Sequence, residues 1–234
     1  DPQLVQPITV RRLDVATAQQ RAARLLNLIP MFVLIASFLG GMYCATDATA
    51  GERERGSLEP LLLTPAPRHH LVIGKWLAAT VFSVVTVVLT LLFTLFVLSR
   101  VPLDQIGVRF DLTPSDVAGL LLAVMPLSLF ATGSQLLIAT FARSFKEAQT
   151  YLSLMIFLPM LPAIIFMFEP LQTKTWMTLL PVVGQQAILS DVVSGEPVAG
   201  LSYLLAALAS GLAGLICVYV TARLFRREAI IFGR

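Results

Sequence analysis

The residues best suited to chemistry lie in one short stretch, GERERGSLEPLLLTP, which runs from Gly51 to Pro65. Four alternating charges, Glu52 to Arg55, stand between two long apolar segments. Charges in this position would face the solvent, where a partner protein could contact them. A solvated, salt-bridged loop that merely joins two helices would show the same pattern. The spacing alone does not separate a docking element from such a connecting loop.

Placed on a helix, Glu52 to Leu63 forms an amphipathic element. Leu58, Leu61 and Leu62 fall at positions i, i+3 and i+4, which gives one apolar stripe. Arg55 and Glu59 have the i,i+4 spacing of an ion pair, and Glu52 and Arg55 have the i,i+3 spacing. Pro60 would interrupt this helix or open a second short one. We expect the element to lie along the membrane surface, with its leucines against the bilayer or neighbouring helices.

Other chemistries fit this stretch and its surroundings poorly. Gly51 and Gly56 have the spacing of a phosphate-binding loop, but Ser57 and Leu58 follow where a lysine and a Ser/Thr are required. An intramembrane metalloprotease would need converging histidine and carboxylate ligands. His69 and His70 are adjacent, so their side chains should diverge on a helix. We therefore predict no nucleotide site, no metal site and no catalytic residue on this chain.

Polar side chains inside the apolar segments are candidates for lining a translocation path. They form one face in each of two segments: Ser83, Thr86, Thr90 and Thr94, then Ser128, Thr132 and Gln135. Gln135 is the most costly of these to bury in lipid and the strongest candidate. The alternative is that the hydroxyl groups bond to their own backbone and help helices to pack.

The elements that must position these residues are membrane helices. Only 13% of the 234 residues are charged and 56% are hydrophobic, and the mean hydropathy is +0.81. A soluble domain has about 25% charged residues, so we predict an all-α, polytopic membrane helix bundle. The net charge of +3 comes from basic residues near the ends of apolar runs, which does not indicate nucleic-acid binding. Five uncharged windows are long enough to span a bilayer: 25–46, 76–99, 117–142, 148–168 and 197–222.

Smaller features refine these five spans. The window 175–190 is short and contains Gln185 and Gln186, so we expect a re-entrant or interfacial segment before the last span. Pro159 and Pro162 should break the fourth span. In the last span, Ala206, Ser210 and Gly214 form a ridge of small residues that suits close packing, within the subunit or across a dimer.

The distribution of basic residues predicts the orientation. With the 47–75 loop in the cytoplasm, most loop arginines and lysines lie on that side. The C-terminus is then cytoplasmic and the N-terminus of this sequence lies outside a cell membrane. We expect residues 1–24 to be the tail of an outside domain and residues 25–234 to be the transmembrane domain, with a sixth span in the full protein.

The stretch ERERGSLEPLLLTPAPRHHLVIGKWLA resembles the cytoplasmic signature of the permease subunits of type-two ATP-binding-cassette (ABC) exporters. The segment PVVGQQAILSDVVSGE and the C-terminal tail are also similar to that family, and most similar to its sodium-extrusion branch. The resemblance implies that the segment 51–70 carries a coupling helix that docks on a separate ATPase. The implied docking residues are Glu52, Arg53, Glu54, Arg55, Gly56, Ser57, Leu58, Glu59 and Pro60.

The same resemblance has implications for partners and activity. ATP and Mg²⁺ would bind to the partner ATPase and no cofactor to this chain, which would not itself be an enzyme. A second permease subunit, identical or different, would complete an exporter of sodium, drugs or another cargo. The competing hypotheses are a membrane scaffold without transport and an intramembrane enzyme. A scaffold would keep the spans without needing the coupling motif.

Overall fold

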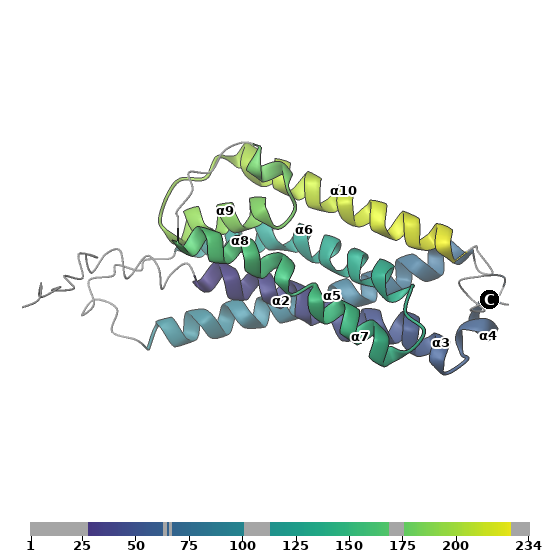
Figure 1. Cartoon of the computed structure of the whole chain (residues 1–234). Coiled ribbons are helices and arrows are strands. Elements are labelled where there is room, and N and C mark those ends of the chain that lie inside the picture. The colour runs from purple at the N-terminus through teal and green to yellow at the C-terminus, as the bar shows by residue number, and fades with distance from the viewer. Residues whose placement is uncertain (1–27, 63–64, 66, 101–112, 169–175, 226–234) are drawn as a thin grey trace, which may run out of the picture.

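The computed structural model describes residues 28–62, 65, 67–100, 113–168 and 176–225, and this part of the chain forms a bundle of helices (Figure 1). Five helices are long and apolar enough to cross a membrane: Leu28–Glu54, Arg68–Leu98, Pro114–Ala139, Phe145–Phe166 and Gly200–Leu224. The predicted all-α bundle with five spans is therefore confirmed. The tail predicted for residues 1–24 lies outside the described residues.

The first span is longer than its apolar window. Helix α2 (Leu28–Thr46) continues through a π-helical turn (Asp47–Gly51) into the short helix α3 (Glu52–Glu54). The hydroxyl groups of Thr46 and Thr49 donate to the carbonyls of Met42 and Ala45, at 2.8 and 2.6 Å. Hydroxyl groups that bond to carbonyls four residues back slightly destabilise and often bend a helix, and these two lie just before and within the wide turn. The charged residues that follow are thus held on a continuous helix rather than on a loop.

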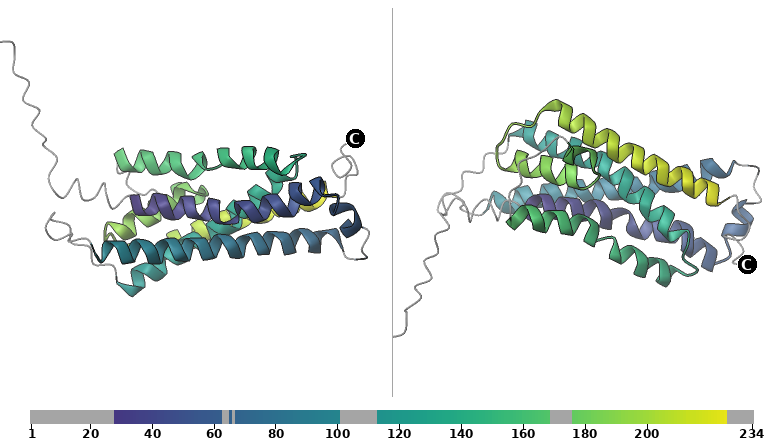
Figure 2. Two further views of the ribbon diagram at one scale, coloured as in Figure 1. Left: turned by 90° about the horizontal axis from the view of Figure 1, so that it is seen from below. Right: turned by 45° about the horizontal axis from the view of Figure 1, so that its top comes forward.

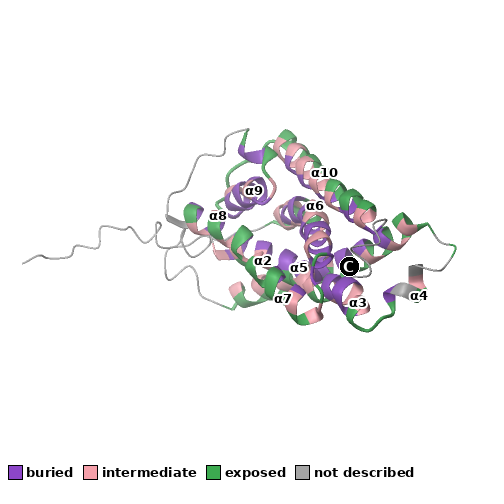
Figure 3. Cartoon of the chain, turned by 45° about the vertical axis from the view of Figure 1, so that its right-hand side comes forward, coloured by how far each residue is buried: buried purple, intermediate pink, exposed green. Residues whose placement is uncertain are grey.

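Two long helices form the middle of the chain. Helix α4 (Leu58–Leu62) precedes α5 (Arg68–Leu98), and α6 (Pro114–Ala139) follows. Helix α6 begins with a capping box, in which the Thr113 backbone N–H donates to the Asp116 carboxylate at 2.8 Å. Its buried residues lie around its whole circumference, which is typical of a central helix. Figure 3 shows buried residues on the inner helices and exposed ones on the outer faces of α8 and α10.

The fourth span consists of two helices, α7 (Phe145–Leu154) and α8 (Phe157–Phe168). A break was predicted at Pro159 and Pro162, but it lies earlier, at Met155 and Ile156. Pro159 has no N–H to bond to the Met155 carbonyl, and its ring would clash with that carbonyl in a continuous helix. The N–H of Leu158 bonds to the Met155 carbonyl instead, at 3.0 Å. Pro162 is accommodated inside α8.

The segment before the last span folds as a single 3₁₀ turn (Met177–Leu179) and the short helix α9 (Val183–Val193). Most of α9 is buried, and it packs among α2, α6, α8 and α10. It lies at the opposite end of the bundle from α3 and α4 (Figure 1). A short buried helix fits the re-entrant alternative better than an element exposed at an interface, although its depth in a bilayer stays a prediction.

The last span, α10 (Gly200–Leu224), packs closely on α6. A Cβ added at Gly214 would lie 2.8 Å from the Leu129 carbonyl oxygen, and one added at Gly133 would lie 2.9 Å from the Gly214 carbonyl oxygen. The two backbones therefore approach as closely as glycine allows. The small-residue ridge of the last span serves contacts within this subunit.

Candidate functional site

Helix α3 is a turn of three charged residues, and each contacts a different membrane helix. We call Glu52, Arg53 and Glu54 the charged turn. Glu52 forms an ion pair with Lys75 of α5, and both side chains are largely buried. Arg53 donates from Nη1 to the Ala142 carbonyl at 2.7 Å and from Nη2 to the Thr140 carbonyl at 2.9 Å, just beyond α6. Glu54 accepts a hydrogen bond of 2.7 Å from the backbone N–H of Phe145, the first residue of α7.

These contacts match the electrostatics of helix ends. The last carbonyls of a helix lack partners within it and carry partial negative charge, whereas the first N–H groups carry partial positive charge. The Arg53 guanidinium binds carbonyls just past the C-terminus of α6, and the Glu54 carboxylate binds an N–H at the N-terminus of α7. The charged turn therefore joins the two helices across their short connection. The charges were expected to face the solvent. Glu54 is exposed as expected, but Glu52 and Arg53 are partly buried against other helices, so the expectation is wrong for those two residues.

The single helix from Glu52 to Leu63 is wrong; the alternative of a second short helix is correct, although that helix begins at Leu58 rather than at Pro60. The chain turns at Gly56, which has φ of +70°, and α4 starts afresh at Leu58. A left-handed residue ends a helix, and the stripe of leucines does not reveal it. Pro60 lies in the first turn of this second helix, where proline is tolerated.

The predicted ion pairs of Arg55 differ as well. Arg55 bonds to Asp47, with Nη1 2.8 Å from Oδ1, and the hydrogen bond to Asp47 is the main cause that raises the pKa of Arg55. Its predicted partner Glu52 binds Lys75 instead. The side chain of its other predicted partner, Glu59, lies outside the described residues.

The leucine stripe is only partly described. Leu58 is 2% exposed and packs among Ala45, Val72 and Trp76, so it touches neighbouring helices as expected. Leu61 is half-buried, and the side chain of Leu62 lies outside the described residues. Beyond the charged turn, whose last residue Glu54 is also exposed, four residues around this break are exposed; we call them the exposed tip: Arg55, Gly56, Ser57 and Pro60.

Two further cations bind the ends of other helices near the charged turn. Arg68, the first residue of α5, donates from Nη1 to the Phe225 carbonyl at 2.8 Å, at the end of α10. Lys75 donates to the Ala48 carbonyl at 2.5 Å, beyond the end of α2. Neighbouring His69 and His70 are exposed, and their ring centroids lie only 4.3 Å apart. The expectation that these two side chains diverge is therefore wrong.

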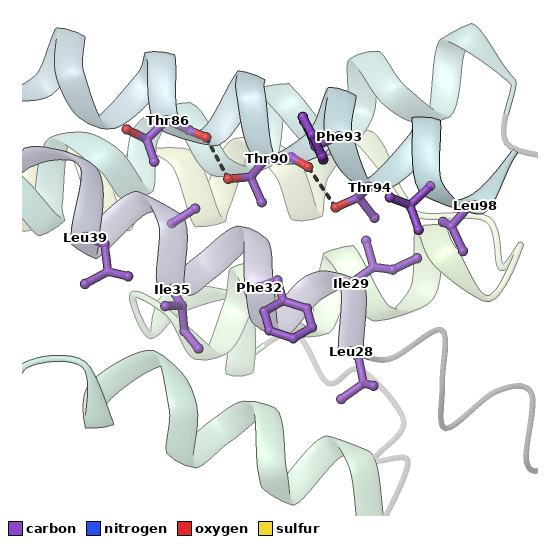
Figure 4. A pocket seen from close by; sticks show the side chains of 12 residues that line it. Leu28, Ile29, Phe32, Ile35, Leu39, Thr86, Thr90, Phe93, Thr94 and Leu98 are labelled. Carbon is purple, nitrogen blue, oxygen red and sulfur yellow. Dashed lines mark hydrogen bonds between the residues drawn. The ribbon is translucent and has the colours of Figure 1, made fainter. Parts of the chain in front are cut away.

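The threonine stripe of α5 lines a surface groove between α2 and α5 (Figure 4). The groove has a volume of about 600 Å³ and an almost wholly apolar wall, which includes Phe32 and Phe93. Thr86, Thr90 and Thr94 donate to the carbonyls of Phe82, Thr86 and Thr90 at 2.7–2.8 Å. Their hydroxyl groups are thus occupied by their own helix, as in the packing alternative.

The other predicted path residues form a buried polar seam where α2, α5 and α6 meet. We define the polar seam as Ser83, Ser128, Thr132 and Gln135, all at most 1% exposed. Ser83 donates to the Ser37 carbonyl at 2.6 Å, Thr132 shares a 2.8 Å bond with Thr80, and Gln135 donates to the Phe38 carbonyl at 2.5 Å. Among the described residues, Ser128 Oγ and Gln135 Oε1 have no hydrogen-bond partner. Unsatisfied buried polar atoms are rare and mark places where water or a ligand can enter.

Two buried glutamines of α9 were not predicted as site residues. Gln185 and Gln186 of α9 are completely buried, and both side-chain polar atoms of Gln186 lack partners among the described residues. The available signal was a pair of glutamines in an otherwise apolar window, and it was taken only as an indication against a full span.

Comparison with known proteins now decides the family. A profile described as "ABC-2 family transporter protein" matches residues 3–228. The chain belongs to the ABC-2 family of transporter proteins. The ABC transporter permease protein NatB of Bacillus subtilis (strain 168) is 32% identical over 201 residues, which cover 83% of this chain and 52% of that protein. The chain spans about half the length of this curated relative.

Membership confirms the family resemblance inferred from the ERERGSLEP stretch. Proteins of the ABC-2 family are components of transporters rather than catalysts. Together with five apolar helices, this makes the chain part of a multi-pass membrane protein.

Proposed function

We propose that this ABC-2 chain is the transmembrane permease part of an ATP-driven exporter, and that it works with a separate ATPase subunit. The observation that carries the proposal is the arrangement at one end of the bundle. The exposed tip, where α3 ends and α4 begins, follows directly on a charged turn that is tied to α5, α6 and α7. A partner that moved the tip would thereby act on several membrane helices at once.

We further propose that the end carrying the exposed tip is cytoplasmic and that two such subunits assemble, as the same or different chains. The excess of basic residues near this end supports the orientation. Arg53, Arg55, Arg68 and Lys75 all lie between α2 and the first turns of α5. The C-terminal end of α10 lies at this same end, where Arg68 contacts it.

For the translocation path, we propose the polar seam, with Gln135 as the residue that contacts cargo. Three observations support this choice. The seam lies at the junction of three spans, it carries unsatisfied polar atoms, and it is closed to solvent as expected of a resting transporter. The groove lined by Thr86, Thr90 and Thr94 is a weaker candidate because its hydroxyl groups already have partners.

Co-purification tests the ATPase partnership. The full-length parent protein is tagged, expressed in its native host and extracted in mild detergent, and the accompanying proteins are identified. We expect an ABC ATPase to accompany the wild type and to be lost with Ser57→Arg, which places a large charged side chain on the exposed tip. Ser194→Arg is the matched control, since Ser194 is also exposed but follows α9 at the other end of the bundle.

Two results would contradict the proposal. The absence of an ATPase from every sample would favour a membrane scaffold without transport. Equal recovery of the ATPase with Ser57→Arg and Ser194→Arg would mean that the partner docks elsewhere.

A further inference from the structure

We call residues 51–70, which carry the exposed tip, the docking segment. It is held to the bundle by an arginine on each side of the exposed tip. Arg53 precedes the tip and binds the carbonyls of Thr140 and Ala142 beyond α6. Arg68 follows it and binds the Phe225 carbonyl beyond α10. These contacts join residues that are 87 to 157 positions apart in the sequence. They are therefore tertiary links that are independent of chain connectivity.

Through chain connectivity alone, a movement of the exposed tip would reach α2 and α5 rather than α6 and α10. The segment is covalently continuous with α2 on one side and with α5 on the other. A pull on the tip would first reach these two helices. Helices α6 and α10 have no covalent connection to the segment and can respond only through side-chain contacts.

Helices α6 and α10 are also packed closely on one another. Their backbones meet at Gly133 and Gly214, where an added Cβ would lie within 3 Å of a carbonyl oxygen of the opposite helix. The indole N–H of Trp76 in α5 donates to the Leu129 carbonyl at the same level of α6, at 3.0 Å. The pair carries Ser128, Thr132 and Gln135 of the polar seam on α6. A displacement of this pair would therefore change the seam.

We propose that Arg53 and Arg68 are positioning residues that transmit movement of the docking segment to α6 and α10, respectively. The inference rests on the proposed function, because the movement originates in the partner ATPase. Arginine suits this role because its planar guanidinium presents several donors in a fixed fork and keeps its charge. Arg53 uses two of these donors on the carbonyls of Thr140 and Ala142, which fixes direction as well as distance.

Hydrogen–deuterium exchange on the purified complex of parent protein and ATPase tests the two links separately. Exchange is measured with and without ATP and Mg²⁺ in peptides covering 51–62, 140–147 and 217–225. In the wild type we expect a nucleotide-dependent change in all three. Arg53→Gln should clearly reduce the change in 140–147, where the Glu54–Phe145 bond still joins the charged turn to α7, and retain that in 217–225. Arg68→Gln should have the opposite effect. Both should retain the change in 51–62.

Arg143→Gln is the matched control. It removes the same charge from an exposed residue of the α6–α7 connection and should leave all three changes intact. Arg53→Lys keeps the charge but cannot reproduce the two-donor fork, so we expect a reduced change in 140–147. It also supplies the comparison if the glutamine variant does not fold. A general loss of stability would affect 140–147 and 217–225 alike in both glutamine variants. An effect of each variant on only one of these segments therefore indicates a specific link.

The outcomes separate this inference from the proposed function. The two-link inference is wrong if Arg53→Gln leaves the nucleotide-dependent change in 140–147 intact. It is also wrong if either variant reduces the changes in 140–147 and 217–225 equally. If the wild type shows no associated ATPase, or no nucleotide-dependent change even in 51–62, the proposed function itself fails.

Discussion

Individual buried glutamines in this bundle differ in how fully their amide groups are bonded. Gln185 accepts a hydrogen bond from the Val182 N–H at 2.8 Å and donates to the Ala206 carbonyl and the Ser210 hydroxyl at 3.1 and 2.5 Å. Gln135 donates to the Phe38 carbonyl, while its Oε1 atom has no partner among the described residues. Gln185 thus has the bonding of a structural residue, and Gln135 retains an acceptor for something else.

Substitution by leucine should separate these two roles. Gln185→Leu leaves the buried Val182 N–H without an acceptor, so we expect it to lower the free energy of unfolding by about 1–3 kcal/mol. Gln135→Leu removes an unsatisfied atom together with one bond, so its effect should stay below about 1 kcal/mol. If Gln135 contacts cargo, the same variant should lower transport into membrane vesicles. Thermal unfolding in detergent measures the change in stability of both variants. Normal transport by Gln135→Leu would mean that Gln135 does not line the path.

At the scale of the helices, two glycines allow α2 to lie close to its neighbours. A Cβ added at Gly40 would lie 2.6 Å from Thr86 Cβ of α5. One added at Gly41 would lie 2.4 Å from Thr132 Cγ2 of α6 and 2.9 Å from the Ala79 carbonyl oxygen. The close approach brings Ser37 within reach of Ser83 and Phe38 within reach of Gln135. These glycines set the width of the polar seam.

Alanine at Gly41 should therefore push α2 away from α5 and α6. We expect Gly41→Ala to destabilise the protein by roughly 1–3 kcal/mol, as overpacking does in cores. Gly211→Ala is the control, since a Cβ there would have no atom within 4 Å and alanine favours helix by up to about 1 kcal/mol. Both are compared by thermal unfolding. A Gly41→Ala protein as stable as the Gly211→Ala protein would mean that α2 is not held this closely.

Helices were the part of the structure that the sequence could predict. A long uncharged window must be helical in a bilayer, because every backbone group needs a partner within the segment. The partners of Glu52, Arg53 and Glu54 could not be predicted, since they lie 23 to 91 positions away and depend on how the helices pack. Gly56 was visible in the sequence, but its left-handed conformation competes with an equally visible leucine stripe. For Pro159 the break was predictable, and its offset follows from the clash with the carbonyl four residues earlier.

The molecule as a whole has two chemically different ends. One carries the charged turn, the exposed tip and the ends of α6 and α10, and the other carries α9 (Figures 1 and 2). Between them, large exposed apolar side chains such as Phe82, Leu161 and Leu208 cover the outer faces. This distribution suits a bilayer around the middle of the bundle.

Cysteine labelling tests which end faces the cytoplasm. The native Cys44 and Cys217 are first replaced by serine, and single cysteines are then introduced as His69→Cys or Ser194→Cys. His69 and Ser194 are both exposed, and they lie toward opposite ends of the bundle. We expect a membrane-impermeant maleimide added to intact cells to label Ser194→Cys only, and to label His69→Cys after the cells are opened. The reverse pattern would invert the proposed orientation.

The π-helical turn between α2 and α3 determines how the charged motif that follows it could be moved between proteins. Such a turn holds one residue more than an α-helical turn would. Shortening Asp47–Gly51 by one residue would let the helix continue regularly and would rotate Glu52, Arg53 and Glu54 by about 100° around its axis. Their side chains would then no longer aim at Lys75, Ala142 and Phe145. A chimaeric permease that received only the ERERGSLEP sequence would carry these residues without the turn that orients their side chains. The segment to transfer therefore begins at Asp47.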